Sequence, residues 1–108
     1  MKAYLSKAAL SPARRRVLEL MQSIHFGRVE NLAVRQGEPA FDPPPQVIRE
    51  FKFGGDNGPR PELAVGDFQL KAQVVDLFQE LERLADGRVL ALEVKHGLPF
   101  RLLVADAA

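Results

Sequence analysis

The feature that most constrains how this chain can fold is a correspondence between its two halves at an offset of 60 residues. Positions 27 to 39 contain seven identities at this offset, where background composition predicts roughly one. The apolar positions of the preceding segments coincide as well. We therefore predict an ancestral duplication whose two units pack with pseudo-twofold symmetry. The identical residues are Gly27, Arg28, Val29, Leu32, Val34, Gly37 and Pro39 in the first half and Gly87, Arg88, Val89, Leu92, Val94, Gly97 and Pro99 in the second.

Each half is expected to begin with an amphipathic helix. Ser11 is a good N-cap with Pro12 at the first helical position, and the helix should end near His25 because Gly27 follows. The second helix is predicted to start at the Gly66-Asp67 cap and to end at Asp86-Gly87. Its apolar face consists of Leu70, Val74, Leu77, Phe78, Leu81, Leu84 and Ala85.

After each helix the sequence predicts a strand that is closed by a glycine turn. These strands run from Arg28 to Arg35 before Gly37 and from Arg88 to Lys95 before Gly97. In the second hairpin we expect two alternating sets to face the helices, namely Leu90, Leu92 and Val94 and, on the return strand, Phe100, Leu102 and Val104. In the first hairpin prolines interrupt the return, and a strand resumes only from Val47 to Phe53.

These elements define an α+β fold in the order α-β-β-α-β-β. A chain of 108 residues suits a single domain, 1–108, with one shared core. We predict an antiparallel sheet of four or five strands with two helices packed on one face. The halves span 11–53 and 67–104, joined by a connector loop at 54–66 that is rich in glycine and proline. The run Pro43-Pro44-Pro45 is read as a stiff crossover.

Composition excludes several function classes. The chain has no cysteine, which removes disulfides, thiolate nucleophiles and cysteine-based metal sites and suits a reducing compartment. No apolar run has the length of a signal peptide or a bilayer span, so we expect a cytoplasmic protein without membrane contact. The net charge of +1 divides into +3 up to Pro45 (seven basic, four acidic) and −2 after it (eight basic, ten acidic).

No side-chain constellation names a reaction. The chain has no threonine, its three serines have no local histidine or carboxylate motif, and no phosphate-binding glycine pattern occurs. His25 and His96 could pair as a base or as metal ligands, but a helix C-terminus and a turn explain them more simply. We therefore predict no catalytic residue, no metal and no cofactor, and consider a non-enzymatic protein more plausible than an enzyme.

Three adjacent arginines, Arg14, Arg15 and Arg16, are the most suggestive polar feature. Cations in the first turn of a helix oppose its dipole, and an anionic partner would offset that cost. Together with Arg28 they support an alternative function as a regulator that binds nucleic acid or another anion. The competing interpretation is a solvated surface in which Arg15 pairs with Glu19, and the near-neutral net charge favours it.

Two further groups of residues are candidate contact sites. Asp56, Asn57, Arg60 and Glu62 lie in the connector, where they either present polar groups to a ligand or form an ordinary solvated turn. If Leu90 and Leu92 face the helices, an apolar set consisting of Val89, Ala91 and Leu103 lies on the other face of the sheet. Such a face either forms a twofold interface or is an ordinary solvent face with scattered apolar residues. On the first interpretation, the protein is a binding or assembly module that acts through homodimerisation or another protein partner.

The stretch 17–53 resembles the YezD-like family of short bacterial proteins. The resemblance rests on a short helix, the step Phe26-Gly27-Arg28-Val29, a strand, Gly37 and the charged return strand from Val47 to Lys52. The proline-rich insertion and the whole second half depart from the family pattern. The resemblance implies the fold and a bacterial cytosolic setting, and it transfers no residue role.

Overall fold

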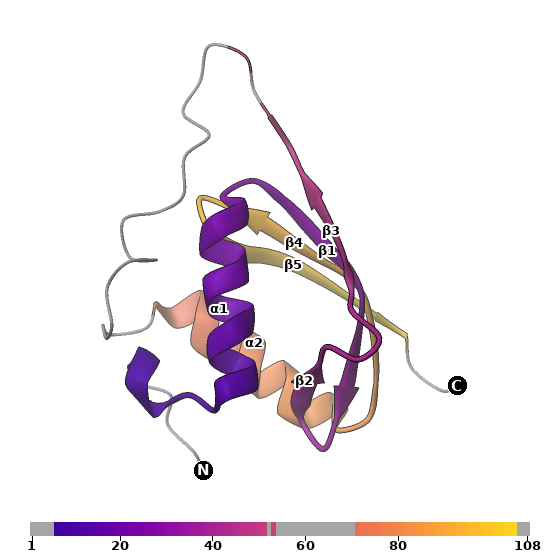
Figure 1. The fold of residues 1–108 in the computed structure, drawn as a ribbon. Coiled ribbons are helices and arrows are strands. Elements are labelled where there is room, and N and C mark those ends of the chain that lie inside the picture. Colours follow the sequence, from indigo (N-terminus) through magenta and orange to yellow (C-terminus); the bar gives the residue numbers. More distant parts are fainter. Residues whose placement is uncertain (1–5, 52, 54–70, 106–108) are drawn as a thin grey trace.

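The computed structural model describes residues 6–51, 53 and 71–105 of the chain (Figure 1). It confirms the predicted α+β fold. A short 3-10 turn at Lys7–Ala9 precedes the first helix. The elements that follow are α1 (Pro12–Ile24), β1 (Gly27–Arg35), β2 (Glu38–Ala40), β3 (Gln46–Arg49), α2 (Ala72–Leu84), β4 (Gly87–Lys95) and β5 (Leu98–Ala105).

The sheet has five antiparallel strands, and both helices lie on the same side of it (Figure 1). The strand order is β2-β1-β4-β5, and β3 pairs with β1 next to β2. The two long central strands pair in a continuous register from Gly27 opposite Val94 to Val34 opposite Gly87. No helix in the described ranges is long and apolar enough to cross a membrane.

Helix α1 begins and ends where the sequence predicts. The Ser11 hydroxyl accepts a hydrogen bond from the backbone N–H of Arg14 at 3.2 Å, and Pro12 occupies the first helical position. At the C-terminal end, His25 has a positive φ of 65° and donates its N–H to the carbonyl of Met21. These signals are local, which is why sequence alone reveals them.

Helix α2 begins later than predicted. Its N-cap is Lys71, whose extended backbone (φ −74°, ψ 155°) cannot belong to a helix that started at Asp67. The predicted end is close to the observed one, because the C-cap is Ala85. The Gly66-Asp67 cap itself lies outside the described residues.

Both helices and both central strands contribute to one apolar core. Met21 of α1 and Phe78 of α2 are fully buried and lie in the same cluster as Leu32 and Leu92 of the sheet. Burying side chains of this size stabilises the fold by about 1.5–3 kcal/mol each. The helix faces predicted from periodicity are therefore the faces that pack on the sheet.

The two halves match in structure at the same offset as in sequence. Helices α1 and α2 have corresponding bounds, and so do β1 and β4. The N–H of Gly37 donates to the carbonyl of Ala85 at 2.8 Å, and the N–H of Gly97 donates to that of His25 at 2.9 Å. The hairpin turn of each half thus caps the helix of the other half. Descent from a duplication stays a prediction.

The first hairpin differs from the prediction at its far end. Strand β2 has only three residues, and β3 stops at Arg49 although a strand was expected as far as Phe53. Arg49 pairs with Gly27, the first residue of β1, so that β3 ends where its partner strand begins. The peptide bond between Asp42 and Pro43, in the segment between β2 and β3, is cis.

Candidate functional site

The face of the sheet turned away from the helices carries exposed apolar side chains from β4 and β5. Leu90, Phe100 and Leu103 are 46%, 52% and 46% exposed. Ala91 pairs with Leu103 in the β4–β5 register and is almost covered at 8%. We call Leu90, Ala91, Phe100 and Leu103 the outer-face patch.

The predicted orientation of strand β4 is wrong for two residues, Val89 and Leu90. Val89, expected on the outer face, is fully buried in the core, whereas Leu90, expected to face the helices, is half exposed. The reason is a β-bulge: Val89 pairs with Val104 and Ala91 with Leu103, which leaves Leu90 as an extra residue. Ala91 and Leu103 keep their predicted side of the sheet.

Strand β1 changes phase at the same level. Val29 and Leu32 are both buried although they are three positions apart, an odd spacing that strict alternation would place on opposite faces, and Asn31 between them has a positive φ of 59°. Asparagine tolerates this conformation better than most residues. Because Val29 pairs with Leu92 and Leu32 with Val89, the two central strands shift together and the core stays continuous.

A second bulge places Phe100 on the outer face. Glu93 pairs with Arg101 but Val94 pairs with Pro99, so that Phe100 is the extra residue of β5. Lys95 lies over the Phe100 ring at 3.9 Å from the centroid, and the Arg101 guanidinium is 5.6 Å from it. The return-strand prediction is therefore wrong for Phe100.

Charges of both signs surround the outer-face patch. Arg101 approaches Glu93 at 3.8 Å across β4 and β5, and Arg28 is 2.6 Å from Glu30 on β1. All four side chains remain partly accessible to solvent, between 26% and 58%. The face thus combines exposed apolar groups with paired charges.

Arg14 is not available for an anionic partner, in contrast to the prediction. Its side chain is only 5% exposed and lies 2.8 Å from Glu38 and 3.6 Å from Glu82. It also donates a hydrogen bond to the carbonyl of Gly37 at 3.1 Å. Arg14 joins α1 to the first hairpin turn and to α2, and the Ser11 hydroxyl donates to the same Glu38 at 2.5 Å.

The other predicted arginines do not form one site. Arg15 donates to the carbonyl of Ala8 at 3.3 Å, and its expected partner Glu19 binds Lys7 instead at 2.9 Å. Arg16 is exposed and stacks over the Phe41 ring at 4.1 Å. Arg28 lies after the C-terminal end of α1, whereas the three adjacent arginines lie near its N-terminal end. The loop set Asp56, Asn57, Arg60 and Glu62 lies outside the described residues.

The two histidines lie close together, an arrangement that the sequence left open but did not favour. Their ring centroids are 6.0 Å apart, and the Phe26 ring is 4.6 Å from His25 and 4.8 Å from His96. The bond from Gly97 to the His25 carbonyl causes this proximity, because it brings the β4–β5 turn onto the end of α1. In the part of the chain that the structure describes, no three His, Cys, Asp or Glu side chains gather as metal ligands.

A hollow of about 540 Å³ lies next to these rings. Arg28, Lys95 and His96 line it together with Glu50 and Glu93. The positive charges of Arg28 and Lys95 are balanced by the carboxylates of Glu50 and Glu93. The hollow therefore has no excess of one charge that would select an anion or a metal cation.

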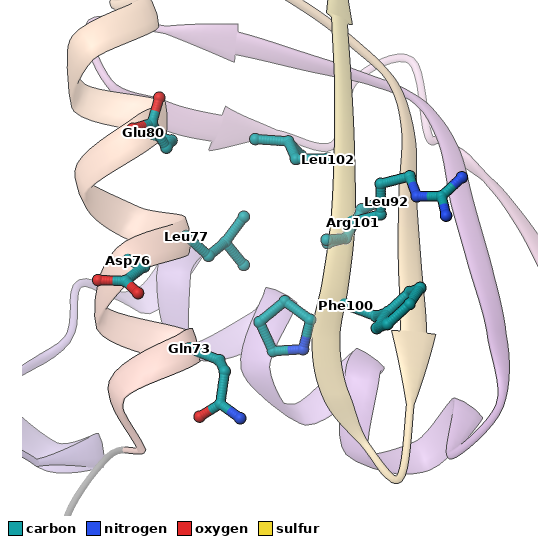
Figure 2. Close-up of a pocket in the computed structure, with 9 residues that line it drawn as sticks. Gln73, Asp76, Leu77, Glu80, Leu92, Phe100, Arg101 and Leu102 are labelled. Atoms are coloured by element: carbon teal, nitrogen blue, oxygen red, sulfur yellow. The ribbon is translucent and has the colours of Figure 1, made fainter.

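A groove with an apolar floor separates α2 from β5. Its first part has a volume of about 220 Å³, and a second hollow of about 320 Å³ shares Glu80 and Leu102 with it. Figure 2 shows Leu77 and Leu102 pointing toward one another across the groove, with Phe100 and Arg101 on the opposite side of β5. We call this feature the α2–β5 groove.

Comparisons with family models, curated proteins and solved structures find no match to this chain. The resemblance of residues 17–53 to the YezD-like family therefore stays a prediction.

Proposed function

We propose that this protein is a non-enzymatic assembly module of the cytoplasm that forms a homodimer through its outer-face patch. The observation that carries the proposal is the exposure of Leu90, Phe100 and Leu103 on a sheet face that no described element covers. Grouped apolar residues of this kind mark interaction surfaces, and closed twofold dimers are the commonest assemblies. The lack of cysteine supports a reducing compartment.

The charges around the patch support a second copy as the partner. A twofold interface places the same surface on both subunits, so each charge must meet a compatible group of the other copy. Arg101 and Glu93 lie next to each other and have opposite charges. In a twofold dimer, Arg101 of each copy would pair with Glu93 of the other copy, so that both charges would remain paired.

The test is the oligomeric state of the intact chain. Sedimentation equilibrium at micromolar to high micromolar concentration should report a dimer, and Leu103→Asp should convert it to a monomer with an unchanged circular dichroism spectrum. Val47→Asp is the matched control, because Val47 is 38% exposed but lies on β3. A wild-type monomer throughout this range, or equal effects of the two substitutions, would refute the proposal.

The positions of the predicted arginines do not favour nucleic-acid binding. Arg14 is committed to Glu38 and Glu82, and Arg16 and Arg28 lie near opposite ends of α1. A domain that binds phosphates usually presents several free cations on one face.

A further inference from the structure

Strand β5 forms one edge of the sheet. Among the described strands it pairs only with β4, along Leu98–Ala105. The other side of an edge strand presents backbone N–H and C=O groups that can pair with an added strand. Many peptide-binding domains use such an edge: main-chain hydrogen bonds provide affinity, and neighbouring pockets select side chains.

The α2–β5 groove lies beside this edge and supplies such pockets. Its helix side is a single stripe of α2, and its sheet side consists of Leu92 of β4 together with residues 99–102 and Val104 of β5. The stripe includes Gln73, Asp76, Leu77, Glu80 and Leu84, at helical spacing. Leu77, Leu92 and Leu102 form the apolar floor (Figure 2). A strand added to β5 would lay every second side chain toward this floor.

Along α2 the rim of the groove carries the carboxylates of Asp76 and Glu80 and the guanidinium of Arg83. Asp76 and Glu80 are both exposed, and Asp76 has no ion pair or hydrogen bond with any other described residue. Glu80 binds Arg83 of the same helix. Across the groove, Arg101 is also a lining residue, and its guanidinium lies 3.8 Å from Glu93. A ligand with a cation near Asp76 would complement the charge of that carboxylate.

The corresponding surface of the first half is hollowed as well, with a volume of about 470 Å³ and a lining that includes Arg16, Leu20 and Phe41. At the offset of 60 residues, Phe41 corresponds to Arg101 and Arg16 to Asp76. Phe41 is half-buried against the core, and Arg16 stacks on its ring. In the second half, position 101 is an arginine and the adjacent Phe100 lines the groove, while α2 presents the Asp76 carboxylate where α1 presents the Arg16 guanidinium. The two surfaces therefore differ in charge, and a cation beside Asp76 would complement the second one.

We infer that the α2–β5 groove binds an extended peptide segment of a partner protein. The segment pairs with the edge of β5 that no other described strand occupies, places alternate apolar side chains over Leu77, Leu92 and Leu102, and sets a lysine or arginine beside Asp76 and Glu80. The inference concerns a different surface from the proposed homodimer, because Leu90, Ala91 and Leu103 of the outer-face patch do not line the groove and only Phe100 belongs to both.

The probe is a fluorescein-labelled heptapeptide in which valine alternates with lysine, titrated with the full chain and followed by fluorescence anisotropy. We expect saturable binding, with backbone amide shifts in NMR spectra concentrated along β5 and α2. The analogue with glutamate in place of lysine should bind at least about tenfold more weakly. Two further analogues carry N-methyl groups on every second residue, the first analogue at the odd positions and the second at the even positions. At least one of them should lose binding, because N-methylation removes the N–H groups needed for strand pairing.

Substitutions locate the site. Asp76→Asn combined with Glu80→Gln should weaken binding about three- to tenfold, since exposed ion pairs contribute little each. Glu50→Gln, at an exposed carboxylate outside the groove, should leave it unchanged. No saturation by about 1 mM peptide, equal binding of the glutamate analogue, or no amide shifts along β5 would overturn the inference. The inference would also fall if a second copy of the chain occupied the edge of β5. In that case the peptide would compete with dimer formation, and Leu103→Asp would not dissociate the dimer.

Discussion

At the scale of single residues, the largest difference between sequence and structure concerns Arg14. Three consecutive arginines at a helix start suggest a solvated or anion-binding surface, and nothing local distinguishes the first of them. Its partners Gly37, Glu38 and Glu82 belong to the first hairpin turn and to the other helix. Only the tertiary fold brings these groups together, and for that reason sequence analysis could not identify the buried cation.

We expect Arg14→Met to lower the free energy of unfolding by about 2–3 kcal/mol. The substitution removes a hydrogen bond to the carbonyl of Gly37 and the cation between Glu38 and Glu82, and hydrogen bonds to charged groups contribute about 1.5–3 kcal/mol. Glu38 and Glu82 are about one-third exposed, so solvent limits the loss. Urea unfolding provides the measurement.

Arg16→Met serves as the control for this prediction. Arg16 lies on the same helix but is exposed and contacts only the Phe41 ring among the interactions of the described residues, so the change should cost less than about 1 kcal/mol. Similar losses for the two variants would contradict the assignment of Arg14 as a structural residue.

At the scale of elements, local signals predict the helices well and the strands less well. The Ser11-Pro12 cap and the apolar periodicity locate α1 because both act within a few residues. The orientation of β4 could not be predicted in the same way. Strict alternation assumes an unbroken ladder, but Leu90 is an extra residue opposite β5, and the strand therefore changes phase between Val89 and Ala91.

The bulge predicts opposite sensitivities at two adjacent positions. Val89→Ala should lower the free energy of unfolding by roughly 2 kcal/mol, because Val89 is fully buried and the substitution leaves a cavity. Leu90→Ala should cost less than about 1 kcal/mol, because Leu90 is 46% exposed. Chemical unfolding at concentrations low enough to keep the chain monomeric makes the comparison. The reverse order would mean that β4 follows simple alternation.

At the scale of the whole molecule, the two halves depend on each other. The strands β1 and β4 meet at the centre of the sheet, and each hairpin turn caps the helix of the opposite half through Gly37 and Gly97. The sequence offset indicates the repeated units but carries no information on these cross-half bonds. The proximity of His25 and His96 follows from one of these bonds, and for that reason the sequence could raise this pairing but not decide it.

This interdependence predicts that the described halves unfold together. Native-state hydrogen exchange should give backbone amides of β1 and β4, such as Val29 and Leu92, opening free energies that agree within about 1 kcal/mol and match the global value from urea unfolding. The reason is that separating β1 from β4 exposes Met21, Phe78 and the rest of the single core at once. If β4 and β5 exchanged only through global unfolding while β1 opened at a clearly lower free energy, the second unit would be stable alone. The cross-half caps would then be consequences of folding and not conditions for it.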